Sequence, residues 1–397
     1  MKKIVSLFLC LVLSLSLLTA AMAEDVTVTF WHTYGDQETP IIDEVIIPLF
    51  EETHPGIKVD AVRQSGDFNQ MLVTALGTGV VPDVARVDIT KTSAYAKLGG
   101  IVPMDEIEGF AALKDAVLDG PLSTNLWNGH YYGLPLNTNC KAAVVNSEVL
   151  KALGLDTVPA TMEELVDACR TNGNGEYKIN VSGVGDWDLY PWFWLFGGVV
   201  TDDGFTKASG WLDSEASVNA IKTIMQLHDE GIFTIRDVDG TPDAWDGINY
   251  QYAMFLEGPW YPFSETVMPA TVPTWNGKSA SVVGGENIVI FSGSEKKEAA
   301  FEFVQFMLSE EVQLKLLEVG VIPTLKSLVE NDAVKNDAKW SVYMQQLESA
   351  KSRIPTPQAS TVEQLWSDAM NMIFLEGADV QETLTMTAGL IDEELAK

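Results

Sequence analysis

Two hydrophobic periods alternate near the start of the chain. Residues 26–30 and 57–62 alternate apolar and polar side chains, which predicts strands, and residues 83–87 are predicted as a third strand. Between them, apolar residues recur at helical spacing over 42–50, and a second helix is predicted over 68–78. Strands that alternate with helices at this spacing predict right-handed crossovers and a mainly parallel sheet with helices on both faces.

Capping and breaking residues mark the ends of further elements. Thr39 and Pro40 suit the start of a helix, and Pro48 predicts a kink in its last turn. Further along, the sequence predicts a capping box at 161–164, a helix capped by Ser214 and ended by Gly231, a strand at 282–291, two amphipathic helices within 297–317, and a last helix opened by Thr361. No internal repeat interrupts this α/β pattern.

The N-terminus has the three parts of a secretory signal peptide. Lys2 and Lys3 precede an apolar run at 4–18, and Ala21-Met22-Ala23 offers a cleavage site after Ala23. The run is short for a membrane span, and no later segment is long and apolar enough to cross a bilayer. Leu9 precedes Cys10 where a lipoprotein needs a small residue. We therefore expect a periplasmic protein with no lipid anchor and no membrane insertion after cleavage.

Charge and cysteine content limit the partners. The 397 residues carry 25 basic and 56 acidic side chains, a formal net charge of −31. Such a surface repels phosphate backbones, so nucleic acid is excluded as the expected ligand. After the signal peptide two cysteines remain, Cys140 and Cys169, and both a disulfide and two separate thiols are open. No Cys/His spacing typical of a metal site is present, and we expect neither a metal nor a cofactor.

Familiar catalytic motifs are missing from the sequence. It has no nucleophile elbow, Walker loop or zinc helix motif. Residues 237–241 begin like a calcium loop, but Pro242 stands where the sharp turn needs glycine, so a solvated acidic loop is expected. Paired acids such as Asp202-Asp203 would suit a glycosidase, yet they lie at turns and are expected to be surface charge. The protein is predicted not to be an enzyme, and a secreted carbohydrate-active enzyme is the alternative.

Eleven tryptophans are the strongest chemical signal. In α/β folds ligands bind where loops leave the carboxyl ends of strands, and several of these residues lie at strand ends or in loops. An indole packs on the apolar C–H face of a sugar while carboxylates and amides bind its hydroxyls. Five other tryptophans are expected to be structural: Trp127, Trp211, Trp275, Trp340 and Trp366.

Ordered motifs along almost the whole mature chain resemble a known family. They lie at 30–35, 50–59, 79–84, 133–136, 196–198, 253–260, 284–287 and 299–307. In this order and spacing they are similar to the extracellular solute-binding proteins of carbohydrate ABC importers, the maltose-binding-protein-like group. The resemblance implies a monomer that captures a neutral mono- or oligosaccharide without chemistry and presents it to a membrane permease. A non-sugar solute such as a polyamine is the alternative within this class.

The resemblance also implies a domain division. Two α/β lobes would form a periplasmic-binding-protein fold, each a mainly parallel sheet flanked by helices and each discontinuous in sequence. The N-terminal lobe would take 24–136 and 287–330, and the C-terminal lobe 137–286 and 331–397. The ligand would lie in the cleft between them and be enclosed by a hinge motion.

Site residues follow from the same resemblance. The implied ligand contacts are Trp31, His32, Tyr34, Asp67, Gln70 and Asp88 from the N-terminal lobe, Asn137 and Asn139 from the crossing, and Trp187, Trp192, Trp260, Glu286 and Arg353 from the C-terminal side. Two alternatives stay open. His32 is equally suited to local packing beside Asp36, and Arg353 to neutralising surface acids.

Overall fold

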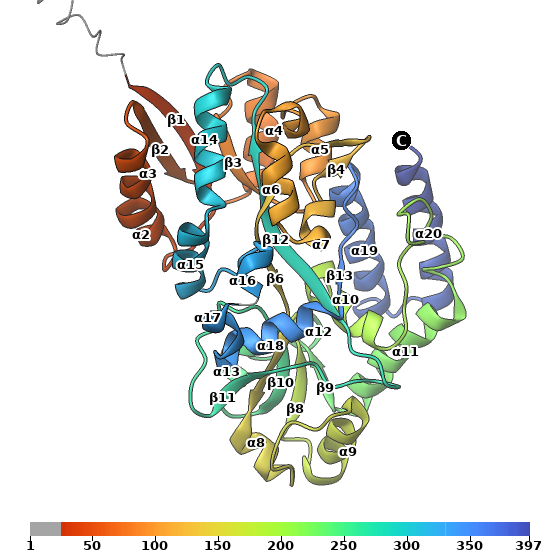
Figure 1. The fold of residues 1–397 in the computed structure, drawn as a ribbon. Coiled ribbons are helices and arrows are strands. Elements are labelled where there is room, and N and C mark those ends of the chain that lie inside the picture. Colours follow the sequence, from red (N-terminus) through yellow and green to blue (C-terminus); the bar gives the residue numbers. More distant parts are fainter. Residues whose placement is uncertain (1–24, 330) are drawn as a thin grey trace, which may run out of the picture.

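Two open β-sheets organise the chain in this computed structural model, which describes residues 25–329 and 331–397. A six-stranded sheet has the order β13-β12-β3-β1-β2, with β6 paired to β12, and a five-stranded sheet has the order β11-β7-β10-β8-β9. Helices flank both sheets, and Figure 1 shows the two as separate lobes, one above the other. The expected two-lobe α/β fold is confirmed. The signal peptide expected at 1–23 lies outside the described residues.

The N-terminal lobe contains the three strands predicted first. β1 (Val26–His32) pairs in parallel with β2 (Ile57–Arg63) and with β3 (Val84–Asp88). β12 (Ser281–Ile290) then adds antiparallel to β3, and β13 (Ala350–Ser352) adds parallel to β12. β1, β2 and β3 are therefore parallel to one another, and β12 and β13 both run in the opposite direction.

The first predicted helix is irregular at a different place from the kink expected at Pro48. It consists of α2 (Thr39–Ile41), the π-helical turn η1 (Ile42–Ile46) and α3 (Ile47–Thr53). A proline ring clashes with the carbonyl four residues before it, which for Pro48 is that of Glu44 inside η1. Widening the turn there relieves the clash, so the irregularity precedes Pro48 instead of kinking the last turn.

Two segments cross between the lobes. β6 (Leu134–Cys140) is buried along its whole length, pairs with β12 and leads through Lys141 into β7 (Ala142–Asn146) of the second sheet. In Figure 1 the long β12 descends from the upper lobe to the lower one beside β6. The second sheet is completed by β8 (Lys178–Val181), β9 (Phe233–Ile235), β10 (Tyr252–Glu257) and β11 (Val267–Ala270).

Side-chain caps confirm the helix starts predicted at Thr161 and Ser214, whereas Thr39 is the first residue of α2 and does not cap it. Thr161 accepts from the backbone of Glu164 at the start of α9 (Met162–Asn172), and Ser214 caps α11 (Glu215–Asp229). The expected start at Thr361 is wrong. α19 (Ala359–Phe374) begins two residues earlier without a side-chain cap, and a further helix, α20 (Val380–Leu395), follows it.

The remaining helices flank the two sheets or connect their strands. They are α4 (Phe68–Thr78), α5 (Thr92–Lys97), η2 (Met104–Glu106), α6 (Phe110–Ala116), α7 (Asp119–Ser123), α8 (Ser147–Ala152), α10 (Asp186–Leu195), α12 (Arg236–Asp239), α13 (Ala244–Gly247), α14 (Lys297–Met307), α15 (Glu310–Glu318), α16 (Lys326–Val329), α17 (Asp332–Lys335) and α18 (Ala338–Leu347). β4 (Leu126–Trp127) and β5 (His130–Tyr131) form a small separate hairpin. Within the described residues, no helix has the length and apolarity that a membrane span requires.

Each lobe has its own hydrophobic core. Phe30, Phe50 and Phe303 meet edge to face in the N-terminal lobe, whereas the C-terminal lobe buries a larger cluster that includes residues of α10, α11, α19 and α20. Cys140 and Cys169 are both buried and form no disulfide. Of the two alternatives left open by the sequence, the structure has two separate thiols. β13 pairs with the first sheet although its residues were assigned to the C-terminal lobe, and the lobe boundaries stay a prediction.

Candidate ligand-binding site

A cavity of about 490 Å³ lies between the lobes beside the crossing strands. Its lining comes from the loop after β1, from β3, β6 and β12, from α13 and the turn after β10, and from the end of α15. The lining residues are Thr33, Gly35, Asp36, Gln37, Glu38, Arg86, Asn137, Thr138, Asn139, Trp245, Trp260, Pro262, Glu286, Val319, Gly320 and Val321. Both lobes therefore contribute, as a ligand cleft at the carboxyl ends of strands requires.

A buried ion pair forms one wall of this cavity. Arg86 Nη2 lies 2.7 Å from Glu286 Oε2, and the two side chains are 7% and 21% exposed. Asn137 Nδ2 donates to the same Glu286 oxygen over 2.6 Å, and Arg86 Nη1 donates to Thr33 Oγ1 over 2.9 Å. Burial raises the pKa of the Glu286 carboxyl, and the charge of Arg86 opposes that shift. The pair is neutral as a whole and offers both donor and acceptor edges.

Aromatic rings form the opposite wall. Trp260 is 41% exposed in the turn after β10, and its ring lies nearly parallel to that of Trp187, with centroids 6.4 Å apart. A Cβ on Gly258 would stand 2.3 Å from the Trp260 ring, so only glycine lets the indole fold back at this turn. Trp245 is 38% exposed, and its Nε1 donates to Glu257 over 2.9 Å. The indole faces thus remain available to a ligand.

An unpartnered amide lies between these walls. Asn139 is 8% exposed on β6, and its Oδ1 accepts no hydrogen bond within the described part of the chain. A Cβ on Gly284 would be 2.3 Å from this oxygen and 2.7 Å from the Trp187 ring. Glycine at this position of β12 therefore makes room for both side chains at the crossing.

The prediction that His32 and Tyr34 contact the ligand is wrong. Both are fully buried, because alternate positions of β1 face the core and Tyr34 continues that stack beyond the strand. The His32 ring lies 5.4 Å from Phe30 and 5.2 Å from Tyr34. Burial, aided by Arg86 and then Arg63, lowers the pKa of His32 to about 4. Tyr34 lies under the Arg86 guanidinium at 4.3 Å, so these rings support the cavity wall from behind.

Three further N-terminal candidates do not line the cavity. Trp31 points to the other face of β1 and packs against the cluster that contains Phe68. Asp67 caps α4 by accepting from the backbone of Gln70, and both residues are exposed. The side chains at these positions serve packing and helix capping.

Trp192 is also not a cleft residue, contrary to the prediction. It is 1% exposed and packs edge-on against Phe233, with centroids 5.0 Å apart. Seven of the ten residues of α10 are buried, so this helix is embedded in the C-terminal core and only its first turn reaches the crossing. Trp187, one turn before Trp192, is the member of this helix that approaches Trp260.

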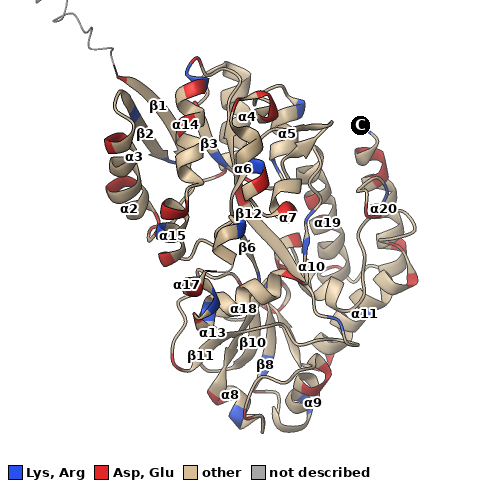
Figure 2. Ribbon diagram, in the orientation of Figure 1, with Lys and Arg blue, Asp and Glu red and all other residues tan. Residues whose placement is uncertain are grey.

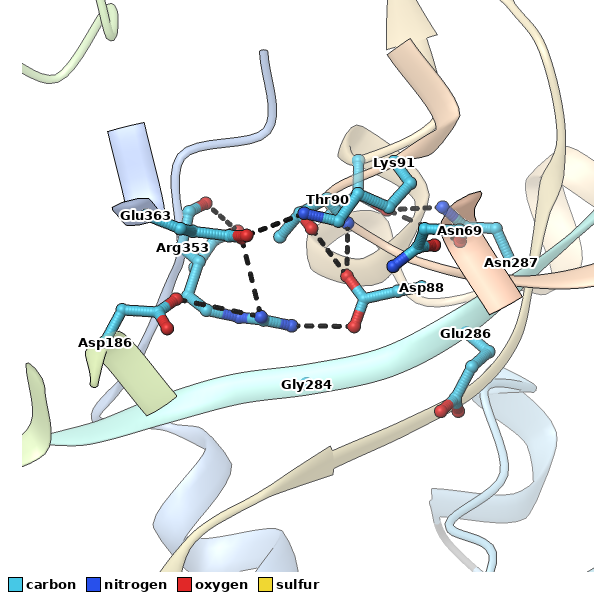
Figure 3. A network of polar contacts seen from close by, with 12 residues as sticks. Asn69, Asp88, Thr90, Lys91, Asp186, Gly284, Glu286, Asn287, Arg353 and Glu363 are labelled. Carbon is cyan, nitrogen blue, oxygen red and sulfur yellow. Dashed lines mark hydrogen bonds and ion pairs between the residues drawn. The ribbon is translucent and has the colours of Figure 1, made fainter. Parts of the chain in front are cut away.

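Asp88 and Arg353 bind each other instead of facing the cavity (Figure 3). Arg353 Nη2 donates to Asp88 Oδ2 over 2.8 Å, and Asp88 Oδ1 accepts from the backbone and hydroxyl of Thr90. Burial opposes ionisation of Asp88, but Arg353 and the Thr90 hydrogen bonds together hold its pKa below the usual range. This pairing agrees with the alternative that Arg353 neutralises acids, although the Asp88 side chain is partly buried, at 33% exposed.

Of the predicted residues, the structure places Asn137, Asn139, Trp260 and Glu286 on the cavity and Trp187 directly beside it. Sequence reasoning missed Arg86, Glu38 and Trp245. Trp245 carried a signal, since it stands beside Asp246 in a loop-rich stretch, whereas Arg86 looked like an ordinary strand residue. Most other acids lie away from the site, and Figure 2 shows them on outer helices such as α3, α11 and α20.

Comparison with known proteins agrees with this architecture. The family described as "Bacterial extracellular solute-binding protein" matches residues 35–314. The diacetylchitobiose binding protein DasA of Streptomyces coelicolor is 24% identical over 77% of this chain and 75% of its own. The GacH receptor of Streptomyces glaucescens, solved unliganded and with acarbose, superposes with a TM-score of 0.83 at 23% identity over 94% of this chain and 99% of its own. UgpB of Mycobacterium tuberculosis, solved with glycerophosphocholine, has a TM-score of 0.77 at 20% identity over 93% and 98%.

The family match covers well over half of the chain, and the solved structures share its two-lobe fold from end to end. On this evidence the chain belongs to the bacterial extracellular solute-binding protein family.

Proposed function

We propose that this chain is the exported binding component of an ABC importer, which captures a neutral mono- or oligosaccharide between its lobes and delivers it to a membrane permease. The observation that carries the proposal is the cavity wall itself. One cavity is lined by an exposed indole, Trp260, by the self-neutralised Arg86–Glu286 pair and by the amides of Asn137 and Asn139. The names of relatives that bind diacetylchitobiose and acarbose support a carbohydrate ligand.

The chemistry of the two walls suits a sugar. An indole face covers the C–H surface of a pyranose, while amide and carboxylate oxygens accept from its hydroxyls and Arg86 donates to them. Arg86 and Glu286 neutralise each other at 2.7 Å and Asp36 pairs with Arg63 at 2.6 Å, so Glu38 is the acid of the lining for which the described residues supply no ion-pair partner. The lining therefore disfavours an anionic phosphodiester, and its indoles and amides favour a hydroxyl-rich sugar over a polyamine.

Capture would proceed by hinge closure. Two of the segments that join the lobes are β6 and β12, which line the cavity through Asn137 and Glu286, so a ligand at these residues touches the hinge itself. Ligand contacts that exist only when both lobes meet favour the closed form, which a permease would then recognise. No step of this cycle changes the ligand covalently.

A binding screen tests the proposal. The purified mature protein is titrated calorimetrically with neutral mono- and oligosaccharides, and with spermidine and glycerophosphocholine as non-sugar solutes. Saturable binding of at least one sugar without release of reducing ends is the expected result. Binding of a non-sugar solute alone would refute the sugar assignment, and release of reducing ends that depends on a single carboxylate would show an enzyme.

A tryptophan pair provides the matched variants. Trp260→Ala should weaken sugar binding by about 1–3 kcal/mol, roughly fivefold to over a hundredfold, because it removes the stacking face. Trp211→Ala is the control, since Trp211 is equally exposed at 43% but does not line the cavity, and its affinity should match that of the wild type. Equal affinities in both variants would remove Trp260 from the site.

A further inference from the structure

Five charged residues meet where the lobes touch beyond Trp187. We call them the cross-lobe ion cluster: Asp88, Lys91, Asp186, Arg353 and Glu363. Asp88 and Lys91 belong to the N-terminal lobe, at the end of β3 and just before α5. Asp186 begins α10 and Glu363 lies in α19, and both of these helices pack in the C-terminal core. Figure 3 shows the five side chains converging on the Arg353 guanidinium and the Lys91 ammonium.

Ion pairs in the cluster join the two lobes directly. Lys91 Nζ lies 2.6 Å from Glu363 Oε2 and also donates to Ser360 over 2.9 Å. Arg353 donates to Asp88 over 2.8 Å, and its Nη1 lies 3.7 Å from both Asp186 and Glu363. The Lys91 and Arg353 side chains are 9% and 11% exposed, whereas those of Asp88, Asp186 and Glu363 are 33%, 15% and 25% exposed. The two cations are therefore buried, and their acidic partners are partly buried.

Trp187 separates this cluster from the cavity. Its ring lies 6.4 Å from that of Trp260 and 5.3 Å from the Arg353 guanidinium. Figure 3 also shows Glu286, which lines the cavity, pointing away from the cluster across β12. None of the five cluster residues lines the cavity. The contact between the lobes therefore continues past the cavity as a buried ionic wall.

We propose that the cross-lobe ion cluster closes one end of the ligand cleft and restricts the site to short sugars, one or two units long. This inference rests on the proposed function. A longer chain would have to pass between Lys91 and Glu363, or between Asp88 and Arg353, and would leave buried charges without partners. Breaking a buried ion pair costs more than a sugar hydroxyl returns as a hydrogen bond. A cavity of about 490 Å³ also lies in the lower part of the 300–1,000 Å³ range of small-molecule sites.

Asp88 shows why the cluster resists a ligand. Its two oxygens already accept from Thr90 N, Thr90 Oγ1 and Arg353, at 2.7–2.8 Å. A sugar hydroxyl that replaced Arg353 there would exchange an ion pair for a hydrogen bond to the carboxylate alone, and would leave the Arg353 guanidinium without this partner. The cluster thus acts on ligand length without being a ligand contact.

A charge-balanced pair of variants tests the wall. Lys91→Ala/Glu363→Ala removes one positive and one negative charge together with their bulk, which should open the end of the cleft. Lys91→Met/Glu363→Met removes the same charges but fills the space, and serves as the matched control. For each protein the dissociation constants of the monosaccharide, disaccharide and tetrasaccharide of the sugar bound in the screen are measured by calorimetry.

The wild type should bind the tetrasaccharide at least about tenfold more weakly than the best short ligand, and the Ala pair should reduce that gap to below about threefold. The Met pair lacks the ion pair but keeps the bulk, so its gap should lie between those of the other two proteins. Two results would overturn the inference: a wild-type protein that binds the tetrasaccharide as tightly as the disaccharide, or an Ala pair that folds and keeps the full gap. If the Ala pair does not fold, the dissociation constants of the wild type for the three sugar lengths are sufficient to test the inference. If no sugar of any length binds while another solute does, the proposed function fails as well, which is a distinct outcome.

Discussion

Replacing Arg86 by methionine should destabilise the protein far more than replacing a surface cation. Arg86 is 7% exposed, lies 2.7 Å from Glu286 and stacks over Tyr34 at 4.3 Å. Methionine keeps much of the volume but leaves the Glu286 carboxylate buried without its cation. Removing one partner of a buried pair costs about 3–5 kcal/mol, and we expect a loss of stability of that size near pH 8.

The cost should shrink in acid. Burial already raises the pKa of Glu286, and loss of the opposing Arg86 charge raises it further. The folded variant therefore binds a proton at Glu286 at a higher pH than the unfolded chain does, so its stability falls as pH rises through that window and recovers below it. At pH 5 the Arg86→Met protein should lie closer to the wild type than at pH 8.

Urea unfolding at both pH values provides the measurement, followed by far-ultraviolet circular dichroism and by tryptophan fluorescence so that separate unfolding of the lobes is visible. Lys58→Met is the control, because the Lys58–Glu51 pair has the same kind of contact at 2.9 Å but its lysine is 47% exposed. A surface pair of this kind adds little stability. Equal effects of the two substitutions, or an Arg86→Met effect that does not depend on pH, would refute the reasoning.

Three other predictions follow from burial. Because burial lowers the pKa of His32 to about 4, the folded protein binds fewer protons than the unfolded chain between about pH 6.5 and pH 4. Thermal stability should therefore decrease as the pH is lowered from 6.5 to 4, and His32→Gln should reduce this decrease. Cys140 and Cys169 are buried, and burial raises the pKa of the Cys169 thiol to about 12, so a thiol reagent should modify neither in native buffer and both in urea; failure to react in urea would indicate a disulfide. Trp192→Ala should lower stability by about 3–5 kcal/mol in denaturant titration, as expected for a core aromatic, whereas Trp260→Ala should leave stability nearly unchanged.

Local patterns predicted the elements well because their causes are local. The period-two alternation of β1 and β2, the Thr161 and Ser214 caps and the Gly79 end of α4 each depend on residues within one turn or strand. The kink caused by Pro48 was predicted in the wrong turn, because the proline ring clashes with a carbonyl in the preceding turn. The start of α19 was missed because its first turn has no side-chain cap to recognise.

Site residues were harder to predict because exposure is not a local property. Trp192 and Trp260 both follow a proline and look alike in sequence, but Trp192 faces Phe233 inside the C-terminal core, while Gly258 lets Trp260 turn back into the cleft. His32 follows Trp31 at the end of β1, where a loop residue would be free to contact a ligand. The strand continues two residues beyond the predicted 26–30, and its alternation directs His32 into the core.

The sequence by itself determined the α/β class, the export signal as an expectation, and the family, since these depend on periodicity and on motifs that can be recognised in order along the chain. Only the tertiary structure decided which polar residues face the ligand and which face each other. Asp88 and Arg353 are 265 positions apart in the sequence, and Arg86 and Glu286 are 200 positions apart (286 − 86 = 200). Such pairs form only when the tertiary structure brings the two segments together, because the distance between two charges in space, and not along the chain, sets their interaction energy.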